Sequence, residues 1–292
     1  MILITGAAGL IGRHLCSRLK VEGVEFRRFD VRIDPTQDIR NRDAILRALD
    51  GVTGVVHLAA VSRVLWAQED PDRCHETNVA ALSLLADLCL QGARPWLLFA
   101  SSREVYGNPV RLPVREDDEM VPVNIYGRSK LDGELIVNRA RQAGLLANIC
   151  RFTNVYGCQY DHEDRAAMAF ARKAVHGGTM RLNGGGSTFD FTHIYDVTDG
   201  IWRLMRQMNS NRQMPPIHLV SGKGTSLREF AGLAATLALK PVEIHEMPAR
   251  NFEVSGFVGD PSRAAELLGW TSRISLDEGL SQLIADLSLA TG

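Results

Sequence analysis

The sequence has few of the features that mark secreted, metal-stapled or membrane-spanning proteins. Its five cysteines are odd in number, widely spaced and without a C-x-x-C pair, which favours reduced thiols over disulfides or a zinc site. No apolar run approaches the roughly 20 residues of a membrane span, and Met1 leads into an apolar segment with no basic region or cleavage site before it. We therefore expect a cytoplasmic protein that holds no metal.

An excess of charge of either sign is also missing. The 292 residues include 33 basic and 34 acidic side chains, which give a net charge of -1. This balance argues against a broad electrostatic surface for nucleic acid or anionic membranes. Repeats and low-complexity tracts are absent as well, and the length suits one large domain or two closely joined ones. We expect neither nucleic acid nor a membrane as a partner.

The N-terminal segment, residues 2–12, reads ILITGAAGLIG and predicts a strand, a tight turn and a helix. Gly6 would permit the turn, and Gly9 would let backbone N–H groups approach a pyrophosphate. Gly12 would let the helix pack against the strand, with the helix N-terminus facing the negative charge. The pattern indicates a dinucleotide-binding turn in the first βαβ unit.

A second predicted strand, residues 25–29, ends in Asp30. An acidic residue at this place bonds the ribose hydroxyls of the cofactor and repels a 2′-phosphate, which favours NAD over NADP. Three arginines, Arg27, Arg28 and Arg32, surround Asp30 and work against that preference.

The third predicted strand, residues 54–60, is almost wholly apolar, which indicates burial on both faces of a parallel sheet. His57 within it is expected to be a core histidine with satisfied hydrogen bonds. Residues 153–157 are expected to form a strand-end loop and residues 183–186 a structural turn. Further helices are expected over residues 42–49, 72–92, 126–142, 164–176, 196–208, 227–239, 263–268 and 276–287, and further strands over 96–101, 146–152, 180–182, 189–195 and 217–220.

Polar residues, Ser101 to Glu104, directly follow the strand at 96–101, at the end of a sheet strand where open α/β folds bind ligands. Tyr126 and Lys130 are four residues apart and share one face of the helix that begins there. The lysine charge favours the phenolate, so the tyrosine can act as a base near neutral pH. We interpret this pair as catalytic because the glycine turn and Ser102 precede it in the sequence.

In this order, segments 5–12, 38–39, 57–60, 101–107, 126–130 and 154–157 resemble the extended short-chain dehydrogenase/reductase family, the nucleotide-sugar epimerases and dehydratases. The resemblance spans nearly the whole chain and ends at residues 260–270 and 276–280, which look like the family's C-terminal helix signature. It implies an α/β fold with a Rossmann-type doubly wound parallel sheet. The implied NAD-binding domain comprises residues 1–160 and 188–222, and a smaller mixed substrate-binding lobe comprises 161–187 and 223–292.

The resemblance also implies a role for each residue at a matching position. Gly6, Gly9, Gly12 and Asp30 would hold NAD, Asp38 and Ile39 would lie at its adenine, and Lys130 at the nicotinamide ribose. Further cofactor contacts are implied at Leu10, Ile11, Leu58, Ala59, Ala60, Asn78 and Tyr126.

The implied chemistry is transient oxidation at C4 of a sugar. Ser102 and Tyr126 would bond the 4-hydroxyl, and Tyr126 would take its proton as hydride leaves C4 for NAD. A 4-epimerase is the first hypothesis because it needs only Ser102, Tyr126, Lys130 and bound NAD. One alternative is a 4,6-dehydratase or uronate decarboxylase that uses Glu104, since a glutamate precedes the same Val-Tyr-Gly segment in those enzymes. Others are a net NAD(P)-dependent oxidoreductase on a sugar or other hydroxyl substrate, and a catalytically inactive binding module.

The expected substrate is a nucleoside-diphosphate sugar, bound by Ser102, Arg103, Asn154 and Arg250. Two positions depart from the family pattern. Arg103 stands where one class of hexose dehydratase has an aspartic acid, and it cannot act as a general acid. Phe189 stands where the family has an arginine, so a diphosphate clamp lacks one bidentate donor. Candidates to replace the missing charge are Arg63, Arg103 and Arg165.

The helices at residues 72–92 and 126–142 form a four-helix dimer interface in relatives. The resemblance therefore implies a homodimer. Its apolar stripe would come from Leu82, Leu131 and Leu135, unless that stripe faces the sheet.

Overall fold

The computed structural model describes residues 1–248 and 254–290. The chain divides into two compact units. Unit 1 comprises Met1–Gly107, Glu116–Phe152 and Thr198–His218, and unit 2 comprises Asn108–Arg115, Thr153–Val197 and Leu219–Gly292. The predicted boundaries between a cofactor domain and a substrate lobe stay a prediction.

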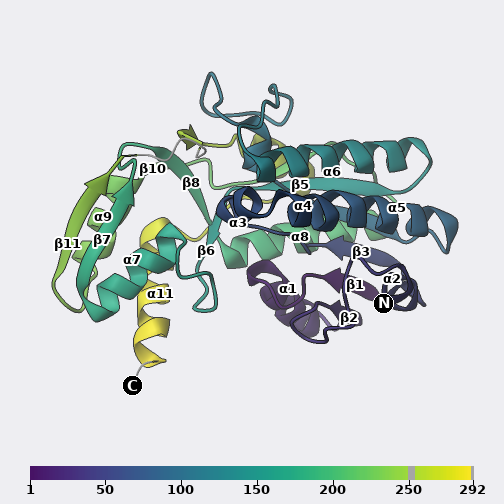
Figure 1. The fold of residues 1–292 in the computed structure, drawn as a ribbon, viewed down its shortest axis with the longest axis horizontal. Helices are drawn as coiled ribbons and strands as arrows, with labels where there is room; N and C mark the ends of the chain where they lie inside the picture. The colour runs from purple at the N-terminus through teal and green to yellow at the C-terminus, as the bar shows by residue number, and fades with distance from the viewer. Residues whose placement is uncertain (249–253, 291–292) are drawn as a thin grey trace. The chain divides into compact units, whose positions relative to one another are not determined.

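Unit 1 is built on a parallel sheet with the strand order β2-β1-β3-β4-β5-β9. Figure 1 labels β1, β2, β3 and β5 of this sheet. The chain moves from β1 outward to β2 and then returns to β3 on the other side of β1. Ligands of open α/β sheets bind at the carboxyl ends of the strands beside such a reversal. The fold is therefore the predicted Rossmann type. The strands are β1 (Ile2–Thr5), β2 (Phe26–Phe29), β3 (Gly54–His57), β4 (Trp96–Ser102), β5 (Ala147–Phe152) and β9 (Ile217–Leu219).

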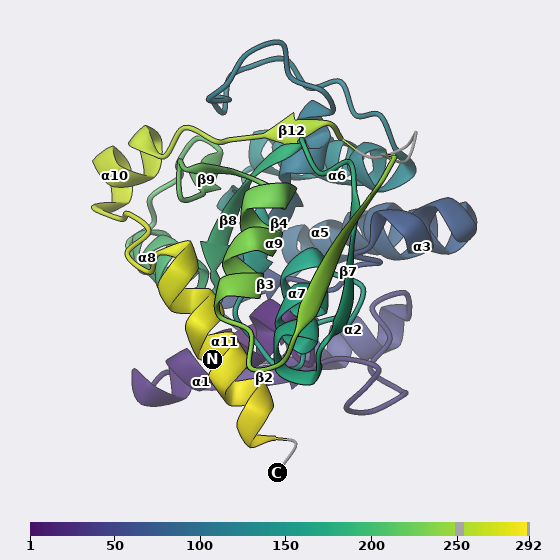
Figure 2. The same cartoon turned by 90° about the vertical axis from the view of Figure 1, so that its left-hand side faces the viewer.

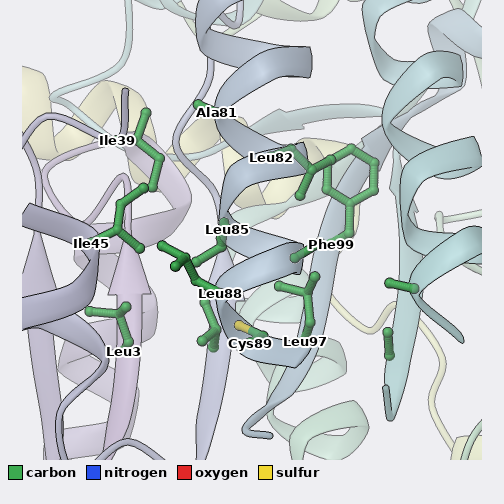
Figure 3. Packing of buried hydrophobic residues seen from close by; sticks show 14 of the residues in the cluster. Leu3, Ile39, Ile45, Ala81, Leu82, Leu85, Leu88, Cys89, Leu97 and Phe99 are labelled. Atoms are coloured by element: carbon green, nitrogen blue, oxygen red, sulfur yellow. The ribbon is translucent and has the colours of Figure 1, made fainter. Parts of the chain in front are cut away.

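Helices cover the sheet of unit 1, which explains why every residue of β1, β3, β4 and β5 is buried. On one face, side chains of α2, α5 and α6 pack against residues of the strands such as Leu3, Leu97 and Phe99 (Figure 3). Leu82 lies in this cluster, so it faces the sheet and does not contribute to a surface stripe. The helices of this unit are α1 (Leu10–Val21), α2 (Arg42–Leu49), α3 (Val64–Glu69), α4 (Pro71–His75), α5 (Ala81–Gln91) and α6 (Ile125–Gln142), and α8 (Ile194–Asn209) begins in unit 2 and ends in unit 1.

Unit 2 contains two small sheets. In one, β8 (Thr188–His193) pairs with β6 (Asn154–Tyr156), β10 (Gly224–Ser226) and β12 (Gly256–Phe257). In the other, β7 (Gly178–Asn183) and β11 (Val242–Met247) run parallel, and Figure 2 shows α7 and α9 beside them. The helices are α7 (Ala166–His176), α9 (Leu227–Thr236), α10 (Ser262–Leu268) and α11 (Leu276–Leu289).

The segment predicted as one helix over residues 72–92 is divided. α4 and α5 are joined by a π-helical turn, Glu76–Ala80, and the separate helix α3 precedes them. Asn78 in this turn accepts the Val61 N–H at 2.8 Å through Oδ1 and donates to the Val61 carbonyl at 3.1 Å through Nδ2. A π turn adds a residue to the helix without ending it, so the apolar spacing on either side still reads as helical.

Unit 2 contains strands that the sequence pattern did not reveal. Residues 153–157, expected to be a loop, contain β6, and β10, β11 and β12 were not expected. β10 and β12 have only three and two residues, and most of β11 is exposed. Their sequences therefore lack the apolar alternation that predicts a half-buried strand.

The described part of the chain comprises residues 1–248 and 254–290. Among these residues, no helix has both the length and the apolar content needed to cross a bilayer. Over the same ranges, no three His, Cys, Asp or Glu side chains gather as a metal site requires. The cysteines of the chain are buried free thiols.

Two helical glycines are expected to respond with opposite sign to the same substitution. A Cβ on Gly133 of α6 would lie 2.5 Å from Phe99 Cζ, whereas a Cβ on Gly232 of α9 would meet nothing within 4 Å. We expect Gly133→Ala to lower the free energy of unfolding by about 1–3 kcal/mol through overpacking. We expect Gly232→Ala to raise it by roughly 0.5–1 kcal/mol, because alanine restricts the unfolded chain. Urea unfolding of both variants measures this, and a stabilised Gly133→Ala would contradict the packing described here.

Candidate active site

The glycine turn after β1 has a conformation that only glycine allows at Gly6. Its φ is +70°, and a Cβ there would lie 2.7 Å from the backbone N of Ala59 and from the carbonyl C of Leu58. The turn therefore packs directly against the chain that leaves β3. Leu58, Ala59 and Ala60 are half-buried at this carboxyl edge of the sheet, where the sequence predicted cofactor contacts.

The absence of a side chain at Gly12 lets α1 pack against the glycine turn rather than against the strand. A Cβ on Gly12 would overlap the carbonyl oxygen of Gly6 and crowd the backbone of Ala7, so α1 begins against the turn itself. Gly9 is the N-cap of α1 and supplies no capping side chain, while Leu10 and Ile11 at the helix start are half-buried. The first N–H groups of α1 lack intrahelical acceptors and carry the positive end of the helix dipole, which suits a pyrophosphate.

Asp30 lies at the end of β2 beside this turn and is buried. Its Oδ2 accepts the Ala8 N–H at 2.9 Å, and its Oδ1 accepts the Arg32 N–H at 2.8 Å. The Arg32 side chain is 3.5 Å from the same oxygen. The carboxylate therefore fixes the turn and also places a negative charge at the position predicted for ribose recognition.

The other predicted adenine-side and cofactor residues differ in exposure. Ile39 is buried in the core of unit 1, while Asp38 is half-buried and pairs with Arg40 at 2.7 Å. The hydrogen bond from Arg40 holds the pKa of Asp38 below its usual value. Asn78 is buried, and besides Val61 it bonds Ser129 Oγ at 2.9 Å, so its amide is committed to the protein. The cofactor roles of these residues stay predictions.

Ser102 is the last residue of β4 and caps the 3-10 helix η2 (Arg103–Tyr106). Its Oγ accepts the N–H of Glu104 at 3.2 Å. A hydroxyl that accepts a hydrogen bond still has its own proton to donate. Ser102 can therefore direct that proton toward a bound ligand.

Tyr126 and Lys130 lie one turn apart on α6, as their spacing predicted. The Nζ of Lys130 is 5.7 Å from the centre of the Tyr126 ring and 5.1 Å from that of Phe99. It donates a hydrogen bond of 2.8 Å to the carbonyl of Ala100 on β4. The ammonium is thus anchored to the same strand that carries Ser102.

Lys130 is buried, with 5% of its surface exposed. Burial lowers the pKa of its ammonium to about 8, and the nearby carboxylate of Glu134 opposes this shift. The group still carries its charge at neutral pH and loses it in mildly basic solution. A positive charge this close to a phenol favours the phenolate.

His57 has the role expected of it. The residue is buried and its Nδ1 lies 2.9 Å from the Thr5 hydroxyl. Burial, together with the Lys130 charge, lowers the pKa of His57 to about 3. It is therefore a neutral core histidine in unit 1, as predicted.

A buried charge pair behind the site was missed in the sequence. Glu134, one turn beyond Lys130 on α6, accepts from Arg151 of β5 at 2.8 and 2.6 Å and from the Ser101 hydroxyl at 2.5 Å. Arg151 also bonds the hydroxyl of Tyr106. Two signals were available: an acidic residue four positions after Lys130, and an arginine inside a mainly apolar strand.

Predicted substrate residues of unit 2 occupy separate elements. Asn154 begins β6 and is half-buried, and Phe189, the predicted departure from the family pattern, is buried in β8. Arg165 precedes α7 and lies 3.6 Å from Asp161. Arg250 falls outside the described residues. The substrate roles of these residues stay predictions.

Comparisons with known proteins identify the family of the chain. A family model described as the NAD dependent epimerase/dehydratase family matches residues 2–218. A UDP-glucose 4-epimerase of Rhizobium leguminosarum bv. trifolii is 27% identical over 309 residues, which cover 95% of this chain and 94% of that protein. UDP-glucuronic acid decarboxylase 1 of Danio rerio is 28% identical over 304 residues, which cover 97% of this chain and 71% of that protein.

A solved structure, MoeE5 in complex with UDP-glucuronic acid and NAD, matches with a TM-score of 0.91 at 27% identity and covers 99% of each chain. The glycine turn, the open N-terminus of α1 and Asp30 fit the dinucleotide named there. The chain is an enzyme whose cofactor is NAD. With the family model matching residues 2–218, the chain belongs to the NAD-dependent epimerase/dehydratase family.

Proposed function

We propose that the protein interconverts the C4 epimers of a uridine-diphosphate sugar. The observation that carries the proposal is the buried Lys130 ammonium, held 5.7 Å from the centre of the Tyr126 ring on the helix that follows Ser102. The names of two relatives, a UDP-glucose 4-epimerase and a UDP-glucuronic acid decarboxylase, support a uridine-diphosphate sugar as the substrate class.

The side chains divide the proton chemistry among them. Tyr126 takes the proton of the sugar 4-hydroxyl and later returns it, and the Lys130 charge stabilises the phenolate between these steps. Ser102 donates a hydrogen bond to the same sugar oxygen. Its Oγ accepts the Glu104 N–H, so the hydroxyl hydrogen is available for this bond. Gly6, Gly9, Gly12 and Asp30 would hold NAD, which when bound supplies a reversible hydride acceptor for C4.

A dehydratase or decarboxylase is the second candidate. It is favoured by the position of Glu104, which is buried two residues after Ser102, and by the decarboxylase relative. Such an enzyme needs a further group that moves a proton or guides a carboxylate. The epimerase needs none, so Glu104 is the residue that separates the two hypotheses.

The product distinguishes the candidates directly. We expect incubation with uridine-, thymidine-, guanosine- and cytidine-diphosphate sugars, without added reductant, to convert a uridine-diphosphate sugar to a product of unchanged mass and new chromatographic position. Mass spectrometry and chromatography measure this. Loss of water or carbon dioxide would replace the epimerase by the second candidate, and stoichiometric consumption of added NAD or NADP would identify a net oxidoreductase.

Substitution of Lys130 and substitution of Tyr126 are expected to change the pH dependence of kcat in different ways. Lys130→Met keeps the side-chain length but removes the charge, so we expect kcat to fall roughly 100-fold at neutral pH. This deficit should shrink as the pH rises above about 8, because the wild-type ammonium is then lost as well. Tyr126→Phe should lower kcat by roughly 10²–10⁴ at every pH, because it removes the proton acceptor itself.

Steady-state rates from pH 6 to 10, with NAD binding measured separately by calorimetry, test this pair. Both variants are expected to fold and to leave the glycine turn intact. A Lys130→Met deficit that stays constant with pH would show that the charge is not what the lysine contributes.

We also propose a homodimer formed through α5 and α6. Leu135 on α6 is 53% exposed and Leu131 is half-buried. Leu135→Glu is expected to yield monomers in sedimentation velocity, because a charge at an apolar interface is desolvated without a partner. Leu239→Glu is the matched control, since Leu239 is 62% exposed and lies outside α6, and this variant should stay dimeric. A wild-type monomer at micromolar concentration would refute the proposal.

A further inference from the structure

Both carboxylate oxygens of Glu104 are bonded to the protein. Oε1 lies 3.0 Å from the Arg103 guanidinium, and Oε2 accepts from the Asn124 amide at 2.8 Å. The carboxylate and the Arg103 side chain are nearly buried, with 8% and 13% of their surfaces exposed. The side chain therefore has fixed partners on both oxygens in a place that water hardly reaches.

These contacts connect the two elements that carry the proton chemistry. Asn124 is the N-cap of α6, and its Oδ1 accepts the Gly127 N–H at 2.7 Å. The backbone is equally close, since a Cβ on Gly127 would lie 2.5 Å from the Glu104 carbonyl oxygen. At the other end, the Glu104 N–H bonds Ser102. One residue thus links the turn of Ser102 to the first turn of α6.

We propose that Glu104 is a positioning residue of this enzyme, which braces Ser102 against the helix of Tyr126 and Lys130 and exchanges no proton with the substrate. The proposal deepens the epimerase assignment and rests on it. Its physical basis is that one rigid connection sets the spacing of Ser102 and Tyr126, and an error of about 1 Å in such a spacing can slow a reaction roughly 100-fold.

Two fixed contacts, to Arg103 and to Asn124, argue against Glu104 as a proton carrier. To reach a ligand, the Glu104 carboxylate would have to leave the Arg103 guanidinium, which lies 3.0 Å from its Oε1. The side chain would also have to leave the Asn124 amide in order to reach a ligand. The pair thereby favours an epimerase over an enzyme that uses this glutamate as an acid or base.

Three variants separate bracing from proton transfer. Glu104→Gln keeps an acceptor oxygen for Asn124 but cannot exchange a carboxyl proton, and Glu104→Ala removes both functions. Asn124→Ser keeps a hydroxyl that can cap α6 and removes the amide that bonds Glu104. NAD affinity and the unfolding midpoint of each variant serve as controls for folding.

With UDP-glucose as the probe, the brace predicts a kcat for Glu104→Gln within about tenfold of wild type, and a loss of roughly 100-fold for Glu104→Ala with little change in KM. Asn124→Ser should reduce kcat similarly, and the Glu104→Ala/Asn124→Ser double variant should lose little more than either single one. A Glu104→Gln variant as inactive as Glu104→Ala would identify a proton carrier and overturn the proposal. A nearly wild-type Glu104→Ala would overturn it as well.

A spectroscopic measurement keeps this test independent of the substrate. If wild-type protein converts none of the sugars, the epimerase assignment fails, but the brace can still be tested in the NAD-bound protein. Ultraviolet difference titration, with Tyr126→Phe as the blank, follows the ionisation of the Tyr126 phenol. We expect it to move to higher pH in Glu104→Ala and Asn124→Ser and to stay near wild type in Glu104→Gln. A phenol titration unchanged by Glu104→Ala would show that Glu104 does not position the tyrosine.

Discussion

The burial of one positive charge, the ammonium of Lys130, is the constraint on which the site depends. A buried ammonium is stable only with nearby acceptors and negative potential. The protein supplies a carbonyl at the end of β4, the face of Phe99 and the carboxylate of Glu134 one helical turn away. Because these groups come from both the strand and the helix, they fix α6 at the strand end where Ser102 lies.

α6 therefore carries several of the residues of the site in addition to covering the sheet. Tyr126, Lys130 and Glu134 follow one another at four-residue spacing, which places them on one face. Asn124 fixes the start of this face, and Gly127 and Gly133 let it approach η2 and β4 closely. A side chain on a rigid, tightly packed helix loses little precision to thermal motion, which suits proton transfer over a short distance.

The sequence predicted the parts of the molecule whose chemistry is local. The glycine turn, the Tyr126–Lys130 pair and the apolar parallel strands follow from spacing and residue type, and the structure agrees with each. The sequence marked Glu134 and Arg151 as unusual but did not show that they pair, and it did not show that Asn124 bonds Glu104, because both contacts depend on which strand meets which turn of α6. The short strands of unit 2 were missed for a similar reason, since they exist through pairing with distant segments.

Contacts within the protein fix the conformation of the glycine turn, and this affects the free energy of cofactor binding. Gly6 is packed against Ala59, and Asp30 holds the Ala8 N–H. The backbone predicted to receive the dinucleotide is thus preorganised, so binding there would order little of this segment and little conformational entropy would oppose it. Affinity for the cofactor can then be set by the few groups that touch it, and exchange of the cofactor does not require this part of the chain to unfold and refold.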